Sequence, residues 1–92
     1  MDVETKPSRD LGPTYLYRYF DVRGVLLYVG ISNDPERRDA GHRSGPAWRQ
    51  LAVRMDVDPE PILDRSEAFV REREVIRAER PVFNRHEVTE WW

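Results

Sequence analysis

The chain has 92 residues and a formal net charge of −2 at pH 7, and this length suits one small domain. With 39% hydrophobic and 11% aromatic residues, it is too apolar for a disordered chain, although 35% of the residues are charged. It contains no cysteine, which excludes a disulfide framework and a thiolate zinc site and fits a cytoplasmic location. Residues 1–9 are polar, unlike a signal peptide, and no apolar run approaches the roughly 20 residues that span a bilayer.

Basic and acidic residues separate along the chain. One stretch holds Arg37, Arg38, Arg43, Arg49 and Arg54 with few acids, and the next, 56–67, is mostly acidic. Arginine side chains form paired hydrogen bonds with phosphate oxygens. A phosphate-binding basic side and a mixed solvated surface are equally compatible with this charge pattern.

The first predicted elements form an antiparallel hairpin. We expect residues 1–13, which contain two prolines and a glycine without a hydrophobic period, to be a flexible arm. Thr14 to Phe20 alternates as a strand, with its tyrosines on one face. Val25 to Ile31 is an almost continuous apolar run, which predicts a strand buried on both faces. Gly24 lies in the turn between them, where a positive φ is readily accommodated.

A helix and a third strand should follow. Residues 33–36 combine a capping side chain, a proline and an acid, which predicts a helix that runs to about Arg43. Ala47 to about Ala52 is expected to be a second short helix, with Trp48 and Leu51 turned inward. The alternation from Val53 to Val57 predicts the third strand.

The longest predicted helix covers residues 65–79, after a capping box that begins at Asp64 and before Pro81. The order β-β-α-(α)-β-α predicts an α+β fold, a small three-stranded antiparallel sheet flanked by helices. We expect the domain to span 14–86, with a C-terminal tail at 87–92.

One charged residue lies on the apolar side of this last helix. At 100° per residue, Glu72 falls among Ala68, Phe69, Val75 and Ile76. An ionised carboxylate there is costly unless it is paired, protonated or bound to a metal. A salt bridge to an arginine of the first helix and a functional site both remain open.

The hairpin and the residues after it resemble the GIY-YIG endonuclease superfamily. The second half of the family motif stands as Tyr28-Val29-Gly30, and 13–15 keeps only the tyrosine of the first half. Further family positions are matched by Arg38, His42, Glu72 and Asn84. The likeness extends over about residues 14–84 and is similar to small stand-alone members and to the nuclease domain of the nucleotide-excision-repair subunit. Ile31 stands where that subunit has a lysine.

This resemblance implies a metal-dependent endonuclease that hydrolyses phosphodiester bonds of DNA. Glu72 would hold Mg²⁺ or Mn²⁺, Arg38 would bind the scissile phosphate, and the tyrosines would position or deprotonate the water. His42 would accept a proton or bind phosphate, and Asn84 would orient a tyrosine or the glutamate. The implied catalytic residues are Tyr15, Tyr28, Arg38, His42, Glu72 and Asn84, and the implied substrate-binding residues are Arg37, Arg43 and Gly30.

Two other functions stay open. The weakened first motif and the negative net charge favour a non-catalytic nucleic-acid-binding or regulatory domain with the same fold. Alternatively, a small α+β protein would bind another protein through Trp91 and Trp92. For the nuclease, the partners would be DNA, branched or structured DNA included, and a partner protein or second copy that supplies specificity. DNA repair, mobile-element and defence roles are all compatible with the sequence.

Overall fold

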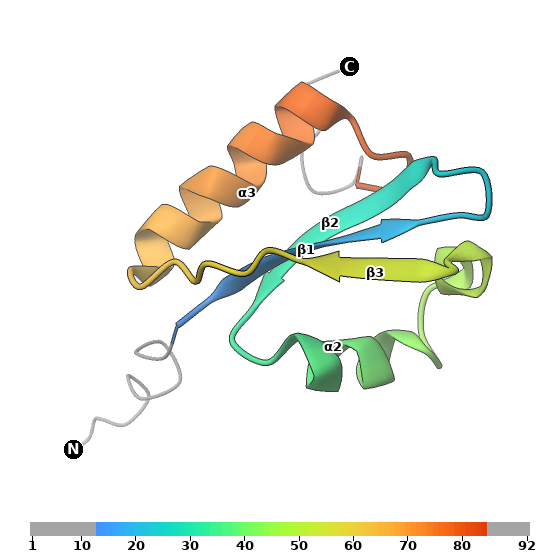
Figure 1. The fold of residues 1–92 in the computed structure, drawn as a ribbon, viewed down its shortest axis with the longest axis horizontal. Coiled ribbons are helices and arrows are strands. Elements are labelled where there is room, and N and C mark those ends of the chain that lie inside the picture. The colour runs from blue at the N-terminus through green and yellow to red at the C-terminus, as the bar shows by residue number, and fades with distance from the viewer. Residues whose placement is uncertain (1–12, 85–92) are drawn as a thin grey trace.

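The computed structural model describes residues 13–84 and contains a three-stranded antiparallel sheet with helices around it (Figure 1). The strands are β1 (Tyr15–Phe20), β2 (Leu26–Ser32) and β3 (Arg54–Val57), in the spatial order β2-β1-β3. The helices are α2 (Pro35–His42), the short 3₁₀ helix η1 (Ala47–Leu51) and α3 (Arg65–Glu79). The predicted α+β fold and element order are confirmed. Nearly all of the predicted arm, and the tail with Trp91 and Trp92, lie outside the described residues.

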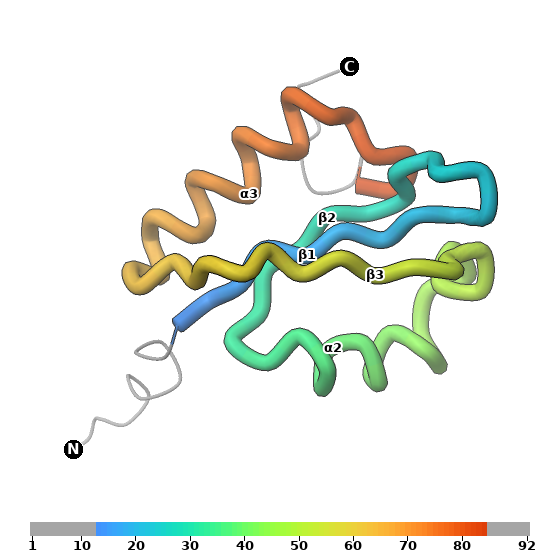
Figure 2. Tube along the Cα trace, viewed as in Figure 1, coloured from blue at the N-terminus to red at the C-terminus, as the bar shows by residue number. Residues whose placement is uncertain are grey.

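The sheet is the middle of three layers, with α3 on one face and α2 with η1 on the other (Figure 2). This arrangement follows from the alternation of the central strand β1, since successive side chains point to opposite faces. Leu16 packs in one cluster with Val75 and Ile76 of α3. Tyr17 and Tyr19 belong to a second cluster on the other face, with Trp48 of η1. Because β2 supplies residues to both clusters, five of its seven residues are buried.

The predicted hairpin is present. Its first strand begins one residue later than expected, and its second strand both begins and ends one residue later. Gly24 has φ +85 in the turn, a conformation that a side chain would strain. The register places Tyr17 opposite Gly30 and Tyr19 opposite Tyr28, and it shifts between Tyr19 and Phe20. This register fixes which tyrosine crosses the glycine of β2.

Capping residues explain where the two α-helices begin and where α3 ends. The Asp34 side chain accepts a hydrogen bond from the Arg37 N–H, and proline occupies the first turn of α2. Asp64 caps α3 by accepting from the Ser66 N–H at 2.8 Å, and Arg80 ends the helix with φ 52. The predicted bounds 65–79 are confirmed.

Two predicted core residues are exposed instead. Phe69 is 51% exposed and lies under the guanidinium of Arg65, with 5.0 Å from Cζ to the ring centroid. Around the axis of α3, the Phe69 side chain points roughly 75° away from the direction in which the helix faces the sheet. It therefore lies beside the sheet and not against it. Leu51 is 54% exposed because the chain becomes extended at the next residue, and Ala52 packs inward in its place. Trp48 is buried, as predicted.

The outer edge of β2 is partly covered by the segment after α3. The N–H groups of Val82 and Phe83 donate to the carbonyls of Leu26 and Leu27, at 3.2 and 2.9 Å. The side chain of Asn84 continues this pairing at Val29. The first half of the strand therefore has partners on both sides, which protects an otherwise exposed edge.

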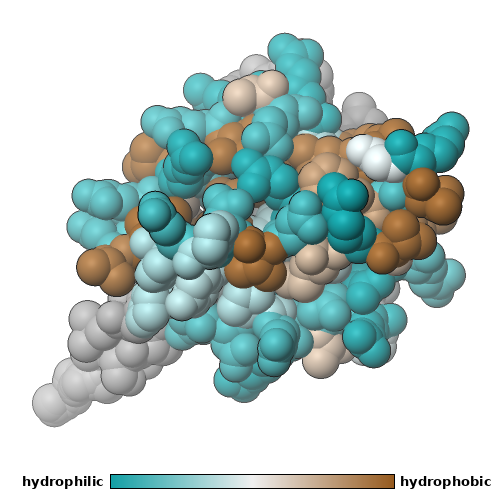
Figure 3. Space-filling view, in the orientation of Figure 1, coloured by the Kyte–Doolittle hydropathy of each residue, from teal (hydrophilic) through white to brown (hydrophobic). Residues whose placement is uncertain are grey.

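The face seen in Figure 3 is largely hydrophilic, with hydrophobic side chains in separate groups. Among the described residues, no helix has both the length and the apolar character that a membrane span requires.

Candidate functional site

The side chain of Tyr17 crosses Gly30 and reaches His42 of α2. A Cβ at position 30 would lie 2.4 Å from the Tyr17 hydroxyl oxygen, so a glycine is required for the ring to take this path. The hydroxyl is hydrogen-bonded to Nε2 of His42 at 3.2 Å. Because Tyr17 is 1% exposed, this phenol is held in one position by packing. Gly30 therefore acts by making room for Tyr17.

His42 sits within a group of aromatic rings. Its ring centroid lies 5.6 Å from that of Tyr28, 5.9 Å from that of Tyr19 and 5.2 Å from that of Trp48. Tyr28 and Trp48 are stacked, with 4.5 Å between centroids and 16° between planes. Such contacts are favourable beyond the area that they bury. We call Tyr17, Tyr19, Tyr28, His42 and Trp48 the aromatic cluster.

A carboxylate ties α2 to the rest of the molecule. Asp39 accepts hydrogen bonds from the Tyr19 hydroxyl at 2.5 Å and from Nε of Arg49 at 2.9 Å. Arg43, the C-cap residue of α2, adds a longer contact of 3.5 Å. None of the residues of α2 is fully buried, so hydrogen bonds and ring contacts at Asp39 and His42 position this helix on the sheet.

The ionisation of this network is set by the same contacts. Burial raises the pKa of Asp39, but the hydrogen bonds from Arg49 and Tyr19 and the nearby guanidinium charges outweigh burial, and the pKa is lowered overall. Burial raises the pKa of Tyr19, and its hydrogen bond to Asp39 raises it further. Tyr19 is thus a proton donor held to a carboxylate and is unsuited to act as a base.

Arg37 and Arg38 are exposed and line a hollow of about 310 Å³ at the end of β2, together with Ser32, Asn33, Asp34 and Gly41. Glu36, from the opposite side of α2, lines another hollow with Val57 of β3. Arg38 is therefore on the side of α2 that faces the β2 edge. Arg43, the third predicted phosphate-binding residue, is exposed beside Asp39.

Glu72 lies on the face of α3 that meets the sheet, as the sequence pattern predicted. Ala68 and Ile76, one turn before and after it, are almost fully buried, whereas Glu72 is half-buried. Glu79 lies on nearly the same line of the helix and reaches Arg18 of β1 through two hydrogen bonds of 2.9 Å. Arg38 and Glu72 thus come from opposite layers of the molecule, on either side of the sheet.

The other predicted residues take different positions. Tyr15 is half-buried opposite Ser32, at the end of β1, and lines the hollow shared by Glu36 and Val57. It lies two residues, roughly 7 Å along the strand, from Tyr17. Asn84 is fully buried, and its amide accepts from the Val29 N–H at 2.8 Å and donates to the Val29 carbonyl at 3.0 Å. These two bonds make Asn84 a strand partner of β2.

The donor groups suit a metal ion bound together with substrate. Among residues 13–84 there is no group of three or more His, Cys, Asp or Glu side chains that could hold a metal. A half-buried Glu72 offers one carboxylate, and magnesium in proteins is commonly held by one or two carboxylates with water and substrate phosphates. The residues therefore fit a cation that phosphate oxygens help to bind.

Sequence reasoning missed Tyr17 and Asp39 as parts of this site. Tyr17 lies on the same strand face as Tyr15, so alternation alone does not distinguish them. Gly30 was the signal that could have pointed to Tyr17, because a glycine inside a buried strand often marks the close approach of another group. Asp39 was counted as one charge in a basic stretch. Its spacing of three from His42 places the two on one helix face.

Comparison of the chain with known protein families and with curated proteins finds no match.

Proposed function

We propose that the chain is a metal-dependent DNA endonuclease of the GIY-YIG type. The observation that carries this proposal is the contact between Tyr17, Gly30 and His42, with Tyr28 alongside. Three positions that resemble the family, Tyr28, Gly30 and His42, thus meet around Tyr17, which the resemblance did not include. A purely structural sheet has no need for a tyrosine–histidine hydrogen bond under a glycine, since an apolar side chain fills such a space well.

Four residues have assigned roles in the proposed reaction. Arg38 binds a non-bridging oxygen of the scissile phosphate through its planar guanidinium. His42 takes the proton of the attacking water on Nδ1, which requires that Nε2 carries the ring proton and donates a hydrogen bond to the Tyr17 hydroxyl oxygen. The Tyr17 contact would then fix both the tautomer and the orientation of the imidazole. Glu72 holds the cation, which when bound neutralises charge on the phosphate.

The direct test is cleavage of supercoiled plasmid and of branched or flapped duplexes with Mg²⁺ or Mn²⁺. We expect metal-dependent cutting by the native chain and its loss in Glu72→Gln and Arg38→Gln. Arg23→Gln is the matched control, because Arg23 is an exposed arginine of the hairpin turn and has no role in the proposed site. Cutting that persists in Glu72→Gln, or that depends equally on both arginines, would contradict the assigned roles.

A second candidate, a non-catalytic nucleic-acid-binding domain, is favoured by one observation. Tyr17 is 1% exposed and Tyr28 is 9% exposed, so neither ring is open to solvent. For this function, DNA binding would be retained without cleavage under any metal condition. Measuring binding and cleavage on the same duplexes separates the two proposals.

A further inference from the structure

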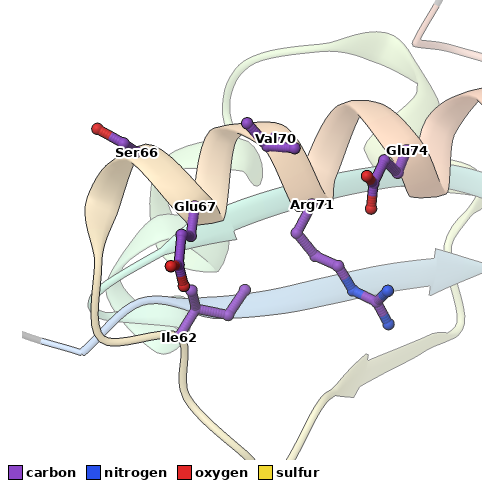
Figure 4. Close-up of a pocket in the computed structure, with 6 residues that line it drawn as sticks. All are labelled: Ile62, Ser66, Glu67, Val70, Arg71 and Glu74. Atoms are coloured by element: carbon purple, nitrogen blue, oxygen red, sulfur yellow. The ribbon is translucent and has the colours of Figure 1, made fainter.

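The outer edge of β3 is an open side of the sheet. Among residues 13–84, β3 is paired only with β1, and it crosses the front of Figure 2. Around the hollow beside α3 in Figure 4, the Arg71 side chain extends over β1, and none of the labelled side chains lies over β3. The opposite edge of the sheet, on β2, is partly covered by the segment after α3. An uncovered edge strand offers its backbone groups to another strand.

Two residues of β3 direct their backbone groups outward. The N–H of Asp58, directly after the strand, donates to the Leu16 carbonyl at 2.9 Å. The register then makes Asp56 face β1 as well, because the bonding side alternates along an antiparallel strand. The N–H and C=O groups of Met55 and Val57 therefore point away from β1. They can bond to a strand that lies against this edge.

The side chains of β3 carry one charge of each sign, spaced for an antiparallel copy of the same strand. Arg54 and Asp56 are 56% and 50% exposed, and they are joined by one bond of 3.1 Å from Nε to Oδ1. If Met55 lies opposite Met55 of a second copy, Arg54 of each copy lies opposite Asp56 of the other, a favourable cross-strand pair. A slip of two residues in either direction sets Asp56 against Asp56 or Arg54 against Arg54. Charge thus selects one register.

We infer that β3 pairs antiparallel with β3 of a second copy of this chain, in the register that sets Met55 opposite itself. The two copies then share one continuous sheet, β2-β1-β3-β3-β1-β2, with a two-fold axis at its centre. Both outer edges of this sheet are partly covered β2 strands, so assembly stops at two copies. The register also brings Val57 of one copy near Val53 of the other, and these side chains are 41% and 66% exposed.

The dimer goes beyond the nuclease proposal and does not depend on it, because β3 supplies none of the residues assigned to the reaction. Its interface is small: β3 has four residues, whereas a standard interface buries about 1,200–2,000 Å² in total. We therefore expect a weak dimer whose fraction rises between about 10 µM and 1 mM protein. Sedimentation equilibrium of the full chain over this range measures the dissociation constant. A chain that stays monomeric throughout would overturn the inference.

Charge reversal tests the register. Arg54→Asp leaves two acidic side chains on each strand, and Asp56→Arg leaves two basic ones. Each variant alone should raise the dissociation constant of its self-dimer about tenfold or more, because like charges then oppose each other twice across the interface. An equimolar mixture of the two variants should form dimers with near-native affinity, because opposite charges face each other again. Recovery in the mixture also shows that both variants are folded.

The controls make the same changes of net charge elsewhere. Arg23→Asp and Glu67→Arg replace exposed side chains of the hairpin turn and of α3. Each should leave the dissociation constant within about threefold of the native value. Self-association that neither reversal at β3 weakens, that the mixture does not restore, or that the controls weaken equally would overturn the inference.

Discussion

Replacing Asn84 should destabilise the domain far more than its place after the last helix suggests. Its amide satisfies both the N–H and the carbonyl of Val29, and both residues are 0% exposed. Asn84→Ala leaves two buried polar groups without these partners, at about 1–3 kcal/mol each. We expect the free energy of unfolding to fall by about 2–6 kcal/mol, a large share of the roughly 5–15 kcal/mol typical of a domain.

Urea unfolding, followed by tryptophan fluorescence and by circular dichroism, measures this loss. The slope of the unfolding free energy against urea should stay constant while the midpoint falls. Asn84→Leu fills the space without restoring the bonds, so a similar loss in this variant would assign the effect to hydrogen bonding. Val82→Ala is the control from the same segment: its side chain is 47% exposed and its backbone bond to β2 is kept. A loss below about 1 kcal/mol for Asn84→Ala would refute the strand-partner role.

Three further predictions concern the site and the core. Gly30→Ala should force the buried Tyr17 ring to move and cost about 1–3 kcal/mol, as in overpacked cores, together with most of the cleavage activity; unchanged unfolding and cleavage would show that the ring has room. Asp39→Asn should weaken the bond to Tyr19 and make stability less sensitive to acid. Because the pKa of Asp39 is lowered on folding, its contribution is fully present above the unfolded value of about 4 and is lost as the pH falls through the lower folded value. Unfolding midpoints of the native chain and of Asp39→Asn, measured between about pH 2 and 7, test this prediction. An equal fall of the midpoint at acid pH in both proteins would argue against it. Leu51→Ser, at a 54% exposed position, should change the unfolding free energy by less than about 0.5 kcal/mol, and a loss typical of core residues would place Leu51 inside after all.

The sequence by itself determined the elements and their order, because their signals are local. Asp64 and Pro81 bracket α3, and Gly24 marks the hairpin turn. Each signal acts through backbone conformation within a few residues, so no knowledge of distant contacts was needed. The carboxylate of Glu72 on the sheet-facing side of α3 was found in the same way, since helical periodicity fixes directions around one axis.

Only the tertiary structure decided which residues meet. Strand alternation places Tyr15 and Tyr17 on one face and cannot choose between them, whereas the register with β2 sets Tyr17 across Gly30. Helical periodicity likewise placed Phe69 near the apolar stripe, but the position of α3 over an edge strand leaves that side chain exposed. The partners of Asn84 and Asp39 are 55 and 20 residues away in sequence, on strands whose placement is fixed by packing. Such contacts depend on how the layers are stacked, a property of the whole chain that local patterns do not carry.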